Sequence, residues 1–513
     1  MKTGNLTRRN FQLATVLTIS LFIVAAFLFA QSAPKQDAAD NKPAAASNLD
    51  AKQIQINLDE AAEFDLPNAN SDLTAVSFNT PDGKEGWMMR IPGWRPIATP
   101  AYADGMIFVG GGYGSYEFYA IDAETGRVAW QMHTNDDGPT AAVVEDGCVA
   151  FNTESCTVIV ADAKTGKLIW QEWLGDPLMS QPAISKGRLY IAYPAGTRGA
   201  QQAQDSATQT DSSNLGPGHR MLCADLKTGR HLWEQKISAD VISAPVVSGD
   251  QILFTCFDGV SFCLDASTGA VVWKKENAGT SAPLIADGHV VTTSKEVKDG
   301  KVYEGLKRLE LKGGEERDRE MLAKEKAGYL RAGGGGGVAM DAATAGKLDS
   351  SVGFSSAPSV AKIEVANQHI GVSTVVGAWA YQGSRAAYHN GQMMNAQGKY
   401  LNSIKAGDGK FAWRAEFKGK GIKEDTQVFS PPALGKLNLY LCGAKGHIVA
   451  VNQEDGALAF AYALKQPMVF QPALANGNIY AGTVNGLLIC LKTGDNDADG
   501  WYAWGGNAQH NKQ

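Results

Sequence analysis

Five polar residues of this 513-residue chain stand at comparable positions, each shortly before an apolar run that opens a hairpin. Four of them are aspartates. If those hairpins converge on a common axis, the carboxylates would meet there, and such oxygen-rich clusters bind hard cations or basic peptides. Aspartates in loops more often cap turns and face solvent, and we favour that interpretation. The five candidates are Arg95, Asp137, Asp176, Asp240 and Asp425.

Histidines and cysteines form no recognisable catalytic or metal-binding motif. His133, His231 and His447 lie in or beside expected strands, and the sequence places no nucleophile or carboxylate partner beside them. The seven cysteines contain no C-x-x-C pair and no Cys/His cluster, so neither zinc nor c-type haem is indicated. We therefore expect no catalytic, cofactor-binding or metal-binding residue.

The cysteines allow two interpretations of their own. Cys148 with Cys156, and Cys256 with Cys263, each flank a short turn and could face one another across a hairpin in an oxidising compartment. An odd number of cysteines leaves at least one unpaired in a monomer. Free cysteine is among the most buried residue types, so we favour buried, unpaired side chains.

The elements that position these residues come from an internal repeat. IDAETGRVAW recurs as ADAKTGKLIW, ADLKTGRHLW and LDASTGAVVW, always with the Trp eight positions after the Asp. In each copy the Asp can cap a tight turn, the Gly supplies a positive φ, and the Trp ends the strand that follows. A second hairpin signal precedes each copy, which gives four short strands in about 40 residues. This period predicts the blades of a β-propeller.

Weaker copies complete the count. They lie at 309–318, 404–413, 451–460 and 489–498, which makes eight turns, and the upstream hairpins, one of them near Pro358, also number eight. Eight blades are therefore expected, with seven as the alternative if the degenerate fifth unit is not a blade. The aromatic residues expected to dock between neighbouring blades are Trp87, Trp130, Trp170, Trp233, Trp273, Trp413 and Phe460.

Two further features bear on the ring. Strand 85–90, which carries Trp87, is expected to become the outer strand of the last blade, after Gly494, because joining the chain ends leaves no open seam. Two insertions interrupt the repeat, a polar loop at 197–219 and a longer segment at 315–352 that is expected to begin with a short helix. Long insertions are places where function often lies.

The N-terminus resembles an export segment. Residues 1–32 combine a positive charge with an apolar run at 13–30, which predicts a cleaved signal peptide or an uncleaved membrane anchor, and we favour the cleaved signal. TRRNF resembles the core of a twin-arginine signal, although the apolar run is unusually apolar for that pathway. Residues 33–84 are expected to form a flexible linker and residues 85–513 the propeller.

The overall charge excludes one class of partner. The chain has 47 Lys and Arg against 53 Asp and Glu, a net charge of −6, and nucleic-acid binding would normally require a basic face. We expect an exported monomer that faces the periplasm or another extracytoplasmic space and contacts a membrane only through an uncleaved N-terminal segment.

The phrase Ala-x-Asp-x-x-Thr-Gly-x-x-x-Trp, best at 120–130 and 160–170, resembles the tryptophan-docking repeat of the quinoprotein alcohol dehydrogenase-like superfamily. The C-terminal WYAWGGNAQHN, at 501–511, is similar to a phrase found at the ends of such propellers. The resemblance covers about residues 85–511 and implies an all-β fold, a single PQQ-like β-propeller. It says little about activity, because the docking Trp is structural.

The resemblance implies two functional classes. Quinoprotein dehydrogenases bind pyrroloquinoline quinone (PQQ) and Ca²⁺ in the central funnel, and in the alcohol oxidisers a disulfide between adjacent cysteines covers the quinone. This chain has no adjacent Cys pair. The other class is non-catalytic and includes the propeller lipoprotein that assists outer-membrane β-barrel assembly, although no lipid-acceptor Cys follows the apolar run here.

The favoured function is therefore a non-catalytic β-propeller that serves as a protein-binding or assembly scaffold in the cell envelope, with no cofactor. A divergent PQQ- and Ca²⁺-dependent dehydrogenase that oxidises alcohols or sugars is the alternative.

Overall fold

The computed structural model describes residues 51–112, 114–153, 157–175, 180–195, 218–241, 244–298, 301–324, 386–407, 409–423 and 428–499. The expected signal or anchor at 1–32, residues 33–50 of the expected linker and the C-terminal phrase at 501–511 lie outside these ranges. Within them, no helix has the length and apolar character needed to cross a membrane.

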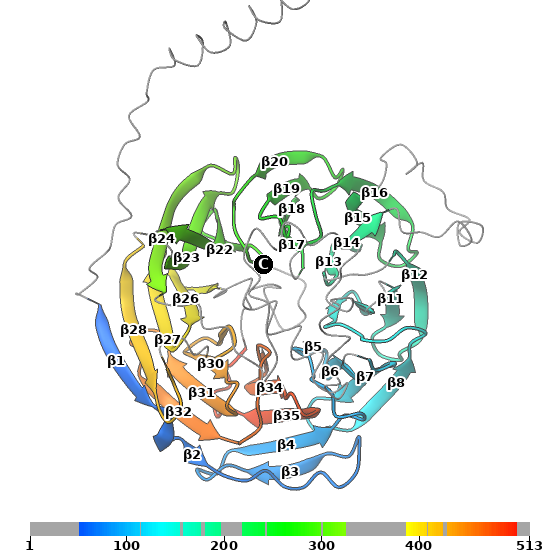
Figure 1. Cartoon of the computed structure of the whole chain (residues 1–513). Coiled ribbons are helices and arrows are strands. Elements are labelled where there is room, and N and C mark those ends of the chain that lie inside the picture. The colour runs from blue at the N-terminus through cyan, green and yellow to red at the C-terminus, as the bar shows by residue number, and fades with distance from the viewer. Residues whose placement is uncertain are drawn as a thin grey trace, which may run out of the picture. The chain divides into compact units, whose positions relative to one another are not determined.

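The described residues form eight β-sheets arranged as the blades of one propeller (Figure 1). Blade 1 contains β5 (Ala101–Ala103), β6 (Met106–Gly110), β7 (Glu117–Asp122) and β8 (Val128–His133). Blade 2 contains β9 (Val143–Glu145), β10 (Cys148–Asn152), β11 (Thr157–Asp162) and β12 (Leu168–Trp173). Blade 3 contains β13 (Ala183–Ser185), β14 (Arg188–Ala195), β15 (Gly218–Asp225) and β16 (His231–Lys236). Blade 4 contains β17 (Val246–Ser248), β18 (Gln251–Thr255), β19 (Ser261–Asp265) and β20 (Val271–Lys275).

The second half of the ring repeats this plan. Blade 5 contains β21 (Leu284–Ala286), β22 (His289–Lys298), β23 (Lys301–Glu310) and β24 (Glu316–Lys324). Blade 6 contains β25 (Ala386–His389), β26 (Gln392–Gln397), β27 (Tyr400–Lys405) and β28 (Phe411–Lys418). Blade 7 contains β29 (Ala433–Leu434), β30 (Asn438–Cys442), β31 (His447–Asn452) and β32 (Leu458–Ala463). Blade 8 contains β33 (Ala473–Ala475), β34 (Asn478–Gly482) and β35 (Leu487–Lys492) together with β4 (Glu85–Arg90). Eight blades, and not seven, are therefore confirmed.

The ring closes through blade 8, as the sequence predicts. Strand β4 pairs antiparallel with β35, and Trp87 lies opposite Cys490. The last blade therefore takes its outer strand from the first part of the described chain and its other three strands from the end, which removes the open lateral seam.

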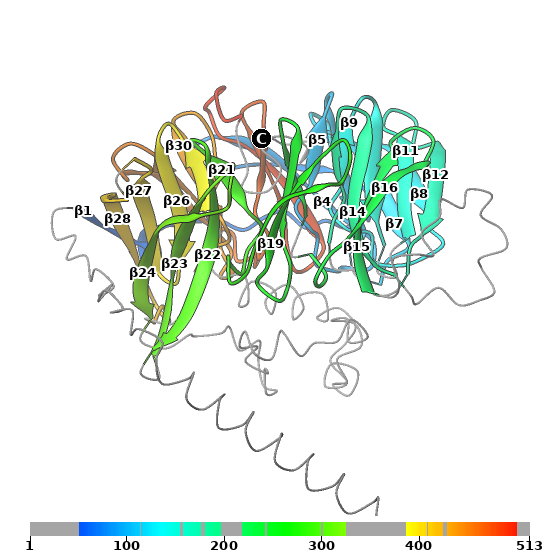
Figure 2. The ribbon, with the colours of Figure 1, turned by 90° about the horizontal axis from the view of Figure 1, so that it is seen from above.

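The expectation of a flexible linker over 33–84 is wrong from residue 51 onwards. Strand β1 (Lys52–Asn57) pairs parallel with β28, and after the 3₁₀ turn Leu58–Glu60, β2 (Ala62–Glu63) pairs parallel with β32. Strand β3 (Val76–Asn79) adds to β4. Figure 2 shows β1 beside β28 at the rim. Strand β1 is mostly polar, so its short alternating pattern, in which Ile56 is buried and its neighbours are exposed, does not stand out in the sequence.

Three further expectations about the insertions and hairpins are wrong. Residues 316–324 form β24, the outer strand of blade 5, and not a helix, because their main chain pairs with β23. The segment at 315–352 is thus part of a blade up to residue 324, and His219 of the loop at 197–219 belongs to β15. Blade 6 begins at Ala386 and not near Pro358, which lies outside the described residues.

The core lies between neighbouring sheets. Phe118 of blade 1 stacks on Phe151 of blade 2 with ring centroids 3.9 Å apart, and residues from both blades share one buried cluster. Buried free thiols contribute to these layers, among them Cys256 and Cys263, so that pair forms no disulfide. Burial raises the pKa of both thiols to about 12. Cys148 is also free and buried, whereas Cys156 lies outside the described residues.

Candidate protein-binding rim

The five channel candidates do not all fall within the described residues. Asp176 and Asp425 lie outside them. Arg95 lies against a glycine-rich turn of blade 1, where a methyl group at Gly114 would be 3.7 Å from the guanidinium carbon. Asp240 accepts a hydrogen bond of 2.8 Å from the backbone N–H of the next residue, Val241. Asp137 is half-buried.

Small apolar residues gather where several links enter the inner strands. Ala98, Ala141, Ala244 and Ala282 come from four different blades and pack in one cluster. Among the residues that the structure describes, no group of three or more His, Cys, Asp or Glu side chains is arranged to hold a metal ion. A cation or basic-peptide site at the axis stays a prediction.

The repeat tryptophans act between blades. Each indole N–H donates to a backbone carbonyl in the turn of the next blade. The donor–acceptor pairs are Trp87–Ala123 at 3.1 Å, Trp130–Ala163 at 3.0 Å, Trp170–Leu226 at 2.7 Å, Trp233–Ala266 at 3.1 Å, Trp273–Leu311 at 2.8 Å and Trp413–Gln453 at 2.9 Å. The glycine of the receiving turn is required: at Gly166, with φ +70°, a Cβ would lie 2.6 Å from the Trp130 ring. These tryptophans therefore have a structural role, which is to hold each blade to the next.

An arginine takes the docking position between blades 5 and 6, which the sequence did not reveal. The guanidinium of Arg308, on β23, donates to the carbonyl of Ala406 in the next blade. Arg308 lies opposite Asp318, the residue found where the repeat expects Trp. If residues 316–324 are read as a strand and not as a helix, the register of blade 5 follows, and that register is the signal that would have pointed to Arg308.

Between blades 7 and 8 the docking residue is Phe460, which has no N–H to donate. Lys84, just before β4, covers this ring, with its ammonium 5.1 Å from the ring centroid. Lys84 also pairs with Asp82, and Asp82 accepts a hydrogen bond of 2.7 Å from the Tyr462 hydroxyl. Burial by itself would raise the pKa of Asp82. Hydrogen bonds from Lys84, Thr80 and Tyr462 outweigh burial and hold this pKa well below its usual value.

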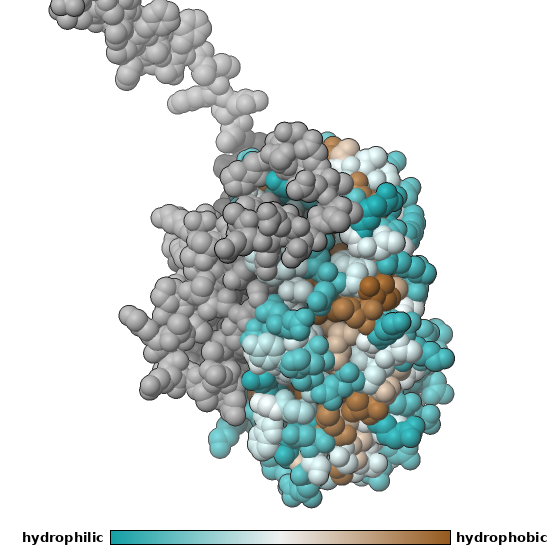
Figure 3. Space-filling model, turned by 90° about the vertical axis from the view of Figure 1, so that its right-hand side faces the viewer, coloured by the Kyte–Doolittle hydropathy of each residue, from teal (hydrophilic) through white to brown (hydrophobic). Residues whose placement is uncertain are grey.

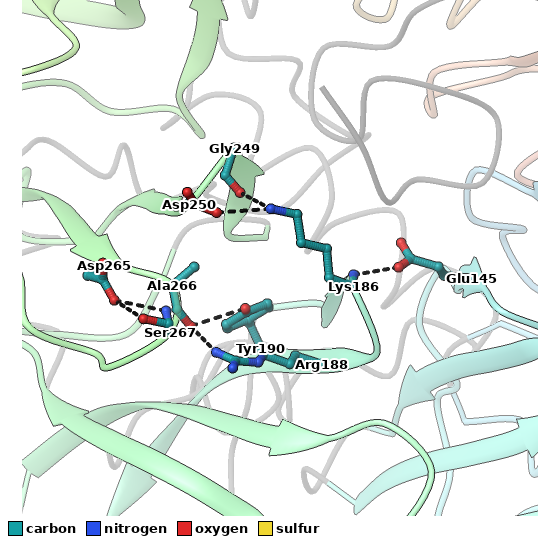
Figure 4. Close-up of polar contacts among 9 residues, drawn as sticks. All are labelled: Glu145, Lys186, Arg188, Tyr190, Gly249, Asp250, Asp265, Ala266 and Ser267. Carbon is teal, nitrogen blue, oxygen red and sulfur yellow. Dashed lines mark hydrogen bonds and ion pairs between the residues drawn. The ribbon is translucent and has the colours of Figure 1, made fainter.

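Polar contacts add a second layer to the joint between blades 3 and 4 (Figure 4). The Ala266 carbonyl accepts from Arg188 at 3.0 Å and from the Tyr190 hydroxyl at 3.2 Å, in addition to its docking Trp. Lys186 pairs with Asp250 of blade 4 at 2.9 Å, and its backbone N–H donates to Glu145 of blade 2 at 2.6 Å. Three consecutive blades are thus connected.

His231 connects the outer strands of blades 2 and 3. Its Nε2 lies 2.9 Å from Glu172 and its Nδ1 lies 3.1 Å from Glu234, which also pairs with Arg220 at 2.8 Å. Although burial opposes protonation, the two carboxylates raise the pKa of His231 to about 9. The sequence could not reveal Glu172 as a partner because it lies on another blade. The cluster is an ion-pair network, without a nucleophile in the set.

The outer strand edges divide the rim into two kinds of surface. The outer strands of blades 6, 7 and 8 are covered by β1, β2 and β3 respectively. In the described part of the chain, β8, β12, β16, β20 and β24 stand at the edges of their sheets without a further strand. Exposed apolar side chains lie on two of these edges, Leu168 and Ile169 on β12 and Val271 and Val272 on β20. Figure 3 faces the rim that carries β8, β12 and β16 and shows apolar patches among hydrophilic residues.

The fold and the docking contacts define a propeller built from PQQ-like repeats. The chain belongs to the PQQ-like repeat family described as outer membrane protein assembly factor BamB, whose family model matches residues 70–142, 119–212, 212–333 and 397–505.

Individual relatives are distant. The chain is 23% identical over 249 residues to the outer membrane protein assembly factor BamB of Nitrosomonas eutropha, a match that covers 44% of this chain and 53% of the relative. It is 24% identical over 245 residues to BamB of Burkholderia pseudomallei, covering 41% and 64%. The chain thus spans about half to two thirds of the length of these curated relatives. The quinohemoprotein alcohol dehydrogenase of Comamonas testosteroni superposes with a TM-score of 0.50 at 12% identity, over 84% of this chain and 78% of that one, a likeness of fold alone.

Proposed function

We propose that this protein is an exported, non-catalytic scaffold of the cell envelope that binds other proteins while they are assembled. The observation that carries the proposal is the rim, where the outer strands of blades 1 to 5 end their sheets in the described part of the chain. An open strand edge offers backbone N–H and C=O groups to an extended segment of another protein.

Three further observations support the proposal. The repeat tryptophans are engaged in holding one blade to the next, which gives partners a rigid ring to bind. The family description, and the names of the two relatives above, refer to outer membrane protein assembly. The positive N-terminus and the apolar run at 13–30 favour export, through either a cleaved signal or an uncleaved anchor.

The proposal is tested by covalent capture in intact cells. The full chain, with a C-terminal affinity tag, is cross-linked in cells that produce it naturally, purified under denaturing conditions and analysed by mass spectrometry. A reproducible small set of envelope proteins is expected. Recovery of the chain without any cross-linked envelope protein would contradict the scaffold function. The mass of the purified N-terminus shows at the same time whether the signal is cleaved.

A separate measurement distinguishes the catalytic alternative. The purified chain is incubated with PQQ and Ca²⁺, freed of unbound quinone and examined by absorbance, with a dye-linked alcohol oxidation assay in parallel. The scaffold function predicts neither stoichiometric quinone absorbance nor dye reduction. Stoichiometric uptake together with alcohol oxidation would favour a quinoprotein dehydrogenase instead.

A further inference from the structure

Among the open edges of the described residues, the β12 edge of blade 2 is the most apolar. Leu168 is 45% exposed and Ile169 is 40% exposed, and the strand continues with the half-buried Trp170 and Trp173. Its one charged residue, Glu172, is already paired with His231 of blade 3 at 2.9 Å.

Three of the other open edges, β16, β20 and β24, contain lysine or several charged residues. Strand β8 contains no Asp, Glu, Lys or Arg, and its exposed residues are Ala129, Gln131 and His133. Strand β20 begins with two exposed valines but ends in Lys274 and Lys275. Strand β16 includes Glu234 and Lys236. Natural proteins place charged residues, lysine above all, on strand edges to prevent the addition of another strand. By this criterion β8 and β12 are the edges least protected against strand addition, and of the two only β12 presents large exposed apolar side chains, Leu168 and Ile169.

The chain itself shows what such an edge accepts. Strand β1 runs parallel to β28, with Lys52 opposite the docking Trp413 and Ile56 opposite Phe417. Alternate residues of β1 point inward, and Trp413 beneath it is only 1% exposed. The equivalent tryptophan of blade 2, Trp170, has no covering strand in the described residues and stays half-buried. The blades have the same construction, so the geometry that seats β1 is repeated at β12.

We propose that the β12 edge binds an amphipathic β-strand of another polypeptide, which adds parallel to Leu168–Trp173 with an apolar residue at every second position. This inference rests on the proposed scaffold function and names the kind of partner and its place on the ring. Main-chain hydrogen bonds supply affinity that does not depend on sequence, while the exposed apolar side chains select an alternating segment.

The test uses a peptide that this fold already seats. Fluorescein-labelled AKQIQINL, the sequence of residues 51–58, is titrated with the full chain and followed by anisotropy. A second peptide carries N-methyl groups on alternate amides, which keep the side chains but remove main-chain donors. We expect saturable binding of the first peptide and binding at least tenfold weaker for the second. Equal binding of the two peptides, or no binding of either, would overturn the proposal.

A matched pair of variants locates the site. Ile169→Lys introduces an edge charge on β12, and Val272→Lys does the same on β20, where Val272 is 46% exposed. We expect Ile169→Lys to weaken peptide binding at least tenfold and Val272→Lys to change it less than twofold. Unchanged melting temperatures would show that both variants fold. The opposite pattern, equal effects of the two variants, or a dimer of the full chain that Ile169→Lys dissociates would refute the assignment of this edge to a foreign strand.

The cross-linking experiment keeps the two proposals apart. If Ile169→Lys captures the same envelope proteins in the same amounts as the natural chain, the scaffold function stands and the β12 site is wrong. If the natural chain captures none, the scaffold function itself fails, whatever the peptide does.

Discussion

Ile56 provides a direct test of the strand that β1 adds to blade 6. The side chain is 2% exposed and packs with Leu58, Trp413 and Phe417 in one buried cluster. Ile→Ala changes in protein cores cost about 2 to 5 kcal/mol, and a strand at a sheet edge relaxes more easily than a central one, so we expect about 2 kcal/mol for Ile56→Ala. Gln55→Ala is the matched control, because Gln55 is exposed on the same strand.

The assay is hydrogen exchange followed by mass spectrometry, which reports local opening without requiring the whole ring to unfold in one step. A loss of about 2 kcal/mol corresponds to an opening equilibrium roughly 30-fold larger. Amides of 52–57 and of β28 should therefore exchange about 30 times faster in Ile56→Ala, while Gln55→Ala should leave them unchanged. Rapid exchange of 52–57 in the natural chain, or equal rates in the two variants, would refute the assignment of these residues to the sheet and restore the flexible linker.

Three further predictions concern the joints between blades. Gly166→Ala should lower the melting temperature more than Gly147→Ala, because both glycines have φ near +70° but only at Gly166 would a Cβ meet the Trp130 ring; equal shifts would count against ring packing as the cause. Trp413→Phe should cost about 1 to 3 kcal/mol in unfolding free energy, because it leaves the carbonyl that accepts the indole N–H buried and unpaired; chemical denaturation that detects no loss would argue against this hydrogen bond. The pKa of His231 is raised from 6.5 to about 9, so its stabilisation is fully present below pH 6.5 and lost as the pH rises through 9. The melting temperatures of the natural chain and His231→Gln should therefore converge by about pH 10, and a constant difference from pH 6 to 10 would contradict the ion-pair network.

The turn of the repeat could be predicted because its chemistry is local. Asp122 accepts hydrogen bonds from the N–H and the hydroxyl of Thr125, at 2.8 and 2.6 Å, and Gly126 takes the positive φ that the turn requires. Each of these contacts lies within five residues, so a single copy of the sequence specifies it. Four near-identical copies then predict the blades, and the unmatched Trp87 predicts the closing strand.

Other parts of the fold depend on partners far away in the sequence. Strand β24 reads as a helix because it is highly charged, but its main chain pairs with β23, and propensity is a weak guide for such a strand. Strand β1 shows only one fully buried side chain in six residues, which is too weak a pattern to stand out from a polar segment. Arg308 docks where a Trp is expected, and no local feature distinguishes it from a surface arginine.

The sequence predicts the type of candidate site but not its position on the ring. Exposed strand edges follow from a propeller, but which edges are covered depends on where the segment at 51–79 lies, and the sequence did not place that segment. The channel candidates were chosen by their offset before each hairpin, and the site that they would form stays a prediction; a cluster of alanines from the links to four blades is what the described residues add there.

The closing of blade 8 has a consequence for how the molecule is made. Glu85 on β4 pairs with Lys492 on β35, 407 residues further along the chain. During synthesis the early strands emerge long before the strands that complete their sheet, and they expose unpaired edges until the last blade has been translated. Contacts of such long range make folding slow. A chain that stops before β33 leaves β3 and β4 as an unsatisfied hairpin, a ready target for chaperones and proteases.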